Sequence, residues 1–131
     1  MATRSSIRFA TREDGVSFSI MPEKINAKFY AHWDGYPEHR GVEIAESLIN
    51  GNKVEGWEVE DLNTRHTDLE YIYYVWQVHG KDTWISIFRR HDYSFESWNL
   101  DFKEEDAFEC VFVGEPQKLI DKYKLNTNEE G

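Results

Sequence analysis

The residue types best suited to chemistry meet in one short segment, Trp33-Asp34-Gly35-Tyr36-Pro37. Its glycine and proline predict a tight chain reversal, in which the glycine supplies a positive φ and the aspartate caps the turn. If the two aromatic rings are exposed, they can stack on a nucleobase or enter a pocket of a partner protein. If they are buried, they only pack against the next helix, and the sequence leaves both roles open.

A second candidate is a row of basic and polar side chains on the first three predicted strands. If these strands are neighbours, alternation places Arg4, Arg8, Ser17, Ser19, Lys28, Tyr30 and His32 on one sheet face. Arginine binds phosphate through two parallel hydrogen bonds, so this face indicates a site for an anion or a nucleotide. With the turn added, the candidate ligand residues are Arg4, Arg8, Lys28, Tyr30, His32, Trp33, Asp34 and Tyr36. The alternative is a solvated outer face whose arginines pair with local acids.

The histidines are the remaining candidates for catalysis, and they are His32, His39, His66, His79 and His91. Two histidines that meet can act as acid and base near neutral pH, as a phosphodiesterase requires. The sequence does not identify such a pair. Zinc needs three or four converging ligands, and no HExxH motif or cysteine pair is present. We therefore assign no catalytic residue, no metal and no cofactor, and we favour a protein that is not an enzyme.

Acidic side chains dominate the second part of the chain. Residues 1–40 hold six Lys/Arg and five Asp/Glu, whereas residues 41–131 hold nine and twenty, and the net charge is −10. Such a body repels the phosphates of duplex nucleic acid but can attract a basic partner. The candidate partner-binding residues are Glu55, Glu58, Glu60, Asp61, Asp101, Glu104, Glu105 and Asp106. The alternative is that the acidity only keeps the protein in solution.

The elements that position these residues follow from hydrophobic periodicity. The predicted strands are residues 5–10, 16–21, 27–33, 69–79, 84–90 and 108–113, and the predicted helices are residues 41–50 and 117–124, with a short helix near 57–62. Short turns dominate, which favours an α+β fold with a single, mostly antiparallel sheet of about six strands and two helices packed on one face. We expect one domain over residues 1–125 and a flexible polar tail over residues 126–131.

Size and composition limit the class of protein. The chain has 131 residues, including eight Phe, seven Tyr and five Trp, which is enough aromatic surface for one core and for a homodimer contact. The single cysteine, Cys110, excludes an internal disulfide. No signal-peptide pattern and no apolar run of about 20 residues is present, so we expect a cytoplasmic protein that does not enter membranes.

Three segments together resemble a known group of sequences. They are the opening Met1-Ala2-Thr3-Arg4-Ser5-Ser6-Ile7, the turn within Tyr30-Ala31-His32-Trp33-Asp34-Gly35-Tyr36-Pro37, and Val111-Phe112-Val113-Gly114-Glu115-Pro116 before the last helix. They resemble uncharacterised small proteins of bacteriophages and prophages, which carry the same Thr-Arg-Ser stretch and Trp-Asp-Gly-Tyr turn. The resemblance covers about half of the chain and excludes the aromatic middle, residues 71–98. It implies a phage setting and carries over no chemistry.

These observations lead to three functional hypotheses. The first is a phage-encoded, non-enzymatic protein that acts inside the host cell and inhibits a host protein through the acidic surface, for example an immune or nucleic-acid-binding factor. The second is a binding or sequestering protein for a small ligand such as a nucleotide, which uses the basic face and the aromatic turn. The third is a histidine-dependent phosphodiesterase.

Overall fold

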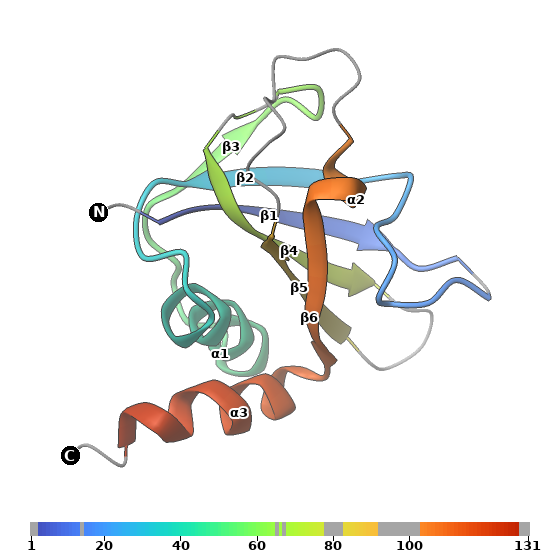
Figure 1. Cartoon of the computed structure of the whole chain (residues 1–131). Helices are drawn as coiled ribbons and strands as arrows, with labels where there is room; N and C mark the ends of the chain where they lie inside the picture. Colours follow the sequence, from blue (N-terminus) through green and yellow to red (C-terminus); the bar gives the residue numbers. More distant parts are fainter. Residues whose placement is uncertain are drawn as a thin grey trace.

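The computed structural model describes residues 3–13, 15–64, 66, 68–77, 83–91 and 103–128. Its described strands form one sheet in the order β3-β2-β1-β4-β5-β6 (Figure 1). Their bounds are β1 Arg4–Thr11, β2 Ala27–Ala31, β3 Trp57–Glu60, β4 Leu69–Gln77, β5 Thr83–Arg90 and β6 Phe108–Gly114. Neighbouring strands are antiparallel except β1 and β4, which run parallel. The prediction of an α+β fold with one mostly antiparallel sheet is confirmed.

The two longer helices cover one face of this sheet (Figure 1). A π-helical turn, η1 (Pro37–Gly41), leads into α1 (Val42–Asn50), and α3 (Pro116–Asn128) packs beside both. The apolar residues that α1 and α3 share with this face form the first core, whose buried members are Ile7, Ala31, Val42, Ile44, Ala45, Tyr73, Val75, Ile85, Ile87 and Leu119. Gly51 ends α1 in the left-handed conformation, with a φ of 72°. None of the described helices has the length and apolar character needed to cross a membrane.

The opposite face of the sheet has a second core and is not solvated. Its buried members are Ala10, Tyr30, Leu69, Ile72, Tyr74, Trp76, Phe88, Ala107 and Phe108. The described residues of 12–26, here called the covering segment, contribute to it, because Phe18, Met21 and Ile25 pack against these residues. The short helix α2 (Glu104–Ala107) adds Ala107.

The predicted strand over residues 16–21 is wrong, because this stretch belongs to the covering segment. The physical reason is that both edges of β1 are already occupied, one by β2 and one by β4. No edge of β1 is left for residues 16–21. Phe18 covers the second face instead: it stacks on Trp84 at 4.9 Å between ring centroids and meets Trp76 edge-on at 5.5 Å.

The short helix predicted near residues 57–62 is also wrong. Trp57–Glu60 is strand β3, which pairs with the outer edge of β2 and places Trp57 opposite Ala31. Pairing with β2 supplies the backbone hydrogen bonds that a helix would otherwise make. At the other end of the chain, α3 continues to Asn128, so residues 126–128 are helical and not part of a tail. Residues 129–131 lie outside the described residues.

Candidate binding site at the Trp33 turn

The expected basic face is covered, and its central cation, Arg8, is 2% exposed. Arg8 donates to both oxygens of the Glu104 carboxylate, at 2.7 and 2.8 Å, and to Tyr74 Oη and Ser6 Oγ at 3.0 Å each. Burial by itself would lower the Arg8 pKa, but the hydrogen bonds and charge of Glu104, together with Tyr74, raise it above its ordinary value. Arg8 is therefore paired within the protein, with Glu104 of α2.

The other members of the expected ligand row are also engaged. Lys28 is 5% exposed and donates to the backbone oxygen of Thr64, and Arg4 pairs with Asp68 at 3.0 Å. Tyr30 is buried and its hydroxyl lies 3.1 Å from the same Asp68 carboxylate. Burial and this hydrogen bond raise the pKa of Tyr30 to about 12. Because Arg8 and Lys28 are buried against protein, these two cations are not accessible to an anion from solvent.

Two histidines flank the Tyr30 ring. The His66 ring stacks on it at 3.7 Å and the His32 ring meets it edge-on at 4.7 Å. Each histidine Nε2 lies 2.6 Å from its own carboxylate, His32 with Glu58 and His66 with Glu60. His79 lies outside the described residues. Within the described part of the chain, no three His, Cys, Asp or Glu side chains are grouped so that they could hold a metal ion.

The aromatic turn follows β2 and is fixed to Thr3, the residue before β1. Gly35 donates its N–H to the Thr3 oxygen at 2.9 Å and accepts a hydrogen bond from the Tyr73 hydroxyl. A Cβ at Gly35 would lie 2.8 Å from the Thr3 oxygen, so glycine is needed for close approach. We expected it to supply a positive φ, but that conformation belongs to Asp34, with a φ of 50°. Aspartate is among the residues that tolerate this region.

The backbone of the turn is also held from the helix side. Arg40, in η1, is 7% exposed and donates to the Trp33 oxygen at 2.6 Å. It pairs with Glu43 of α1, and Glu43 in turn accepts a hydrogen bond from the Trp57 indole N–H at 2.7 Å. Trp33 and Tyr36 nevertheless remain 63% and 44% exposed. The turn thus presents two aromatic rings to solvent on a backbone that is anchored at several points.

A hollow of about 380 Å³, here called the Trp33 hollow, opens beside this turn. Its lining residues are Trp33, Asp34, His39, Arg40, Glu43, Glu55 and Gly56. A smaller hollow of about 260 Å³ shares His39 and Glu43 and extends along α1. Together the two have five carboxylates, from Asp34, Glu38, Glu43, Glu46 and Glu55, against the cations Arg40 and Lys53. An exposed indole beside carboxylates suits a cationic side chain.

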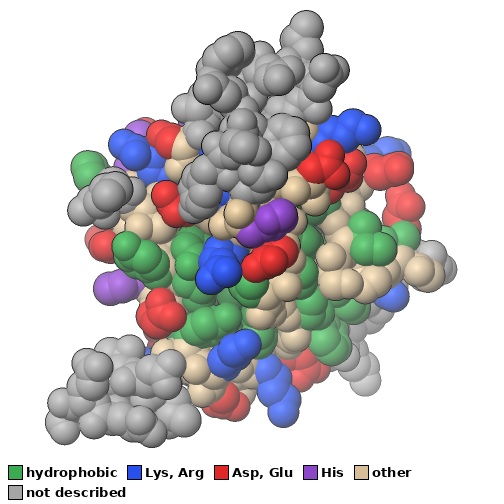
Figure 2. All heavy atoms as spheres, viewed as in Figure 1, with side chains coloured by type: hydrophobic (Ala, Val, Ile, Leu, Met, Phe, Trp, Pro, Cys, Tyr) green, Lys and Arg blue, Asp and Glu red, His purple; other side chains and the backbone are tan. Residues whose placement is uncertain are grey.

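The residues expected to form one acidic surface are divided. Glu55, Asp61, Glu105 and Asp106 are exposed, although the Asp61 carboxylate accepts the Asn63 N–H at 2.8 Å. Glu58, Glu60 and Glu104 bind His32, His66 and Arg8. Asp101 lies outside the described residues. Figure 2 shows acidic and basic side chains interleaved over the visible face, with hydrophobic side chains between them.

Sequence reasoning named His39 but missed Arg40 and Glu43, which complete the helix side of the Trp33 hollow. The available signal was Pro37, because the residues that follow a helix-starting proline form the first turn and must lie beside the chain reversal before it.

Comparison with protein-family models, with curated proteins and with solved structures finds no match to this chain.

Proposed function

We propose that this protein is a non-enzymatic binding protein that inhibits a basic host protein, and that the Trp33 hollow receives a lysine or arginine side chain of that partner. The observation that carries the proposal is the 63% exposure of Trp33 on an anchored backbone, beside the exposed carboxylates Asp34 and Glu55. Tryptophan is the aromatic ring that cations prefer, and it is enriched among the residues that dominate binding energy.

Charge supports a basic partner. The net charge of −10 steers a positively charged protein toward this one and discourages contact with phosphates. Nucleic-acid-binding proteins carry basic patches, so a host factor of that class fits the proposal. The resemblance to small phage proteins supports a host protein as the target.

The burial of Arg8 and Lys28 withdraws support from the nucleotide-binding alternative, since the two cations it needs are 2% and 5% exposed. The hollow beside the aromatic turn is lined by η1, α1 and residues 55–56, and neither Arg8 nor Lys28 contributes to it. We therefore assign the turn to the acidic binding site and not to a nucleotide site.

The test is affinity capture from bacterial lysate at about 0.15 M salt, in which surface charges are screened beyond about 8 Å. The wild-type protein is compared with Trp33→Ala and Glu55→Lys. We expect a basic partner whose binding weakens about 30-fold in Trp33→Ala, the equivalent of about 2 kcal/mol. Glu55→Lys is expected to weaken it as well, because it places a cation in the hollow.

The matched controls are Val113→Ala and Glu115→Lys, which change an exposed apolar residue and an exposed acid at the β6 side of the molecule. Both are expected to retain the partner with wild-type affinity. Equal retention by Trp33→Ala and the wild type, or equal losses in the control variants, would contradict the proposal.

A further inference from the structure

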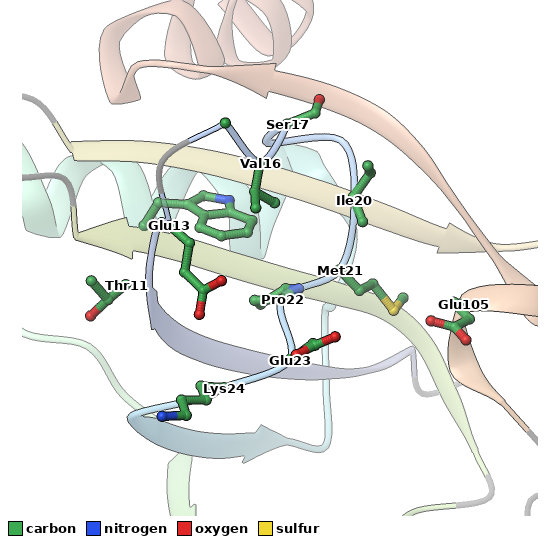
Figure 3. A pocket seen from close by; sticks show the side chains of 12 residues that line it. Thr11, Glu13, Val16, Ser17, Ile20, Met21, Pro22, Glu23, Lys24 and Glu105 are labelled. Atoms are coloured by element: carbon green, nitrogen blue, oxygen red, sulfur yellow. The ribbon is translucent and has the colours of Figure 1, made fainter.

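A second hollow, of about 480 Å³, lies on the other side of the sheet and shares no lining residue with the Trp33 hollow (Figure 3). Here called the Trp76 hollow, it lies between the covering segment, the Trp76 side chain of β4 and Glu105 of α2. Its volume is within the range of small-molecule sites, about 300–1,000 Å³.

The covering segment is held in place around this hollow. Arg12 Nε donates to the Val16 oxygen at 2.8 Å and its guanidinium lies over the Phe18 ring at 4.7 Å. The Ser86 hydroxyl donates to the Phe18 oxygen at 2.5 Å. Connections longer than about 12–15 residues without regular structure are uncommon in compact domains and are frequently functional. This one is anchored at Phe18 while the residues on both sides of that anchor line a cavity.

Part of the lining of the Trp76 hollow is apolar, beside the polar side chains of Thr11 and Ser17. Val16, Ile20, Met21 and Pro22 come from the covering segment, and Ile20 is 58% exposed at its opening. The Trp76 indole N–H is already bonded to Ser86 Oγ at 2.7 Å. Trp76 itself is 1% exposed, so the apolar surface that a ligand can contact comes from the covering segment.

The rim of the Trp76 hollow is acidic. Its carboxylates are Glu13 and Glu23 of the covering segment and Glu105 of α2, against the single cation Lys24. All three acids are exposed, and none is joined by an ion pair to another side chain in the described part of the protein. In Figure 3, Glu105 lies on one side of Met21 and Pro22 and Glu13 on the other, and Glu23 lies next to Met21 and Pro22.

We propose that the Trp76 hollow binds a small organic amine with an apolar body. The body packs on Val16, Ile20 and Met21, and the ammonium group lies among the rim carboxylates. A neutral ligand would gain only the apolar contacts, and an acid would be repelled by the rim. This site is independent of the Trp33 hollow, so either can fail without the other.

Three probes of similar size separate these cases: 2-phenylethylamine, 2-phenylethanol and phenylacetate. Each is titrated into the full-length protein while the backbone amide resonances of Val16, Ile20 and Lys24 are followed by NMR. We expect saturable shifts with the amine and affinity about fivefold or more above that of the alcohol, the effect of one carboxylate about 4 Å from an ammonium in water. Phenylacetate is expected to bind more weakly than the alcohol.

Variants identify the groups responsible. Glu23→Gln and Glu105→Gln are each expected to weaken the amine about fivefold and to leave the alcohol unchanged. Val16→Trp fills the cavity and should abolish binding of the amine and of the alcohol. If Val16→Trp does not fold, the two glutamine variants still test the proposal. Glu115→Gln, at a carboxylate outside the hollow, is the matched control. The proposal is overturned if the amine shifts none of these amides, if the three probes bind equally, or if both glutamine variants bind the amine as the wild type does.

Discussion

At the scale of single residues, the Arg8–Glu104 pair is the most consequential contact, because it joins positions 96 residues apart inside the protein. Arg8 was recognisable from the sequence as part of a row on one strand face. Its burial was not, since neither α2 nor the covering segment follows from the alternation of β1. The same limit applies to Lys28 and to the exposure of Trp33, whereas the chain reversal at Trp33–Pro37 was predictable because its Gly and Pro act locally.

Removing the Glu104 carboxylate is expected to destabilise the protein, because it leaves the Arg8 charge buried without its anion. Fully buried pairs cost about 3–5 kcal/mol when broken in this way. The Glu104 side chain is 30% exposed, so we expect about 2–3 kcal/mol for Glu104→Ala, measured by urea denaturation. Glu105→Ala, at the exposed neighbouring position, should cost under about 0.5 kcal/mol. Similar losses in the two variants would contradict this role of Glu104.

The raised pKa of Tyr30 predicts that the free energy of unfolding falls at alkaline pH. Its pKa is raised from 10.0 to about 12 by burial and by the Asp68 carboxylate, so folding favours the neutral phenol. The stability that this preference contributes is complete below pH 10 and is lost as the pH rises toward about 12. Denaturation midpoints between pH 9 and 12 should therefore fall less steeply in Tyr30→Phe than in the wild type. Parallel curves for the two proteins would show that Tyr30 does not contribute.

At the scale of elements, the sequence identified α1, α3, β4 and β5 but assigned two segments wrongly. Residues 16–21 alternate like a strand and are not one, whereas Trp57–Glu60 is a strand. Alternation reports only that one side of a segment is buried. Whether that segment joins a sheet depends on an available edge, and β2 offered one while β1 did not.

Substitution of Gly35 tests how closely the turn after β2 must approach the start of β1. Gly35→Ala places a methyl group 2.8 Å from the Thr3 backbone oxygen, so the turn must move away from β1. We expect a loss of about 1–3 kcal/mol in the free energy of unfolding, typical of overpacking. Gly41→Ala is the matched control, since its nearest contact would be the flexible end of Leu119 at 3.4 Å. A larger loss at Gly41 than at Gly35 would contradict the explanation from close approach.

At the scale of the whole molecule, the many aromatic residues serve two cores, one on each face of the sheet. We considered a homodimer through an aromatic sheet face, and in the described part of the sheet both faces are covered within one chain. Tyr73, Tyr74 and Trp76 are each at most 1% exposed. We therefore expect a monomer of 15.6 kDa by light scattering at micromolar concentration. A mass of twice this value, independent of dilution, would contradict that expectation.

The parallel pairing of β1 with β4 has a consequence for the timing of synthesis. Tyr74, which accepts a hydrogen bond from Arg8, is added to the chain 66 residues after it. At about 5–20 residues per second, β1 must wait about 3–13 s on the ribosome with one edge unpaired. During this interval Ile7 and Phe9 have no sheet partner from β4, so the nascent chain carries an unpaired, apolar strand edge until β4 is made.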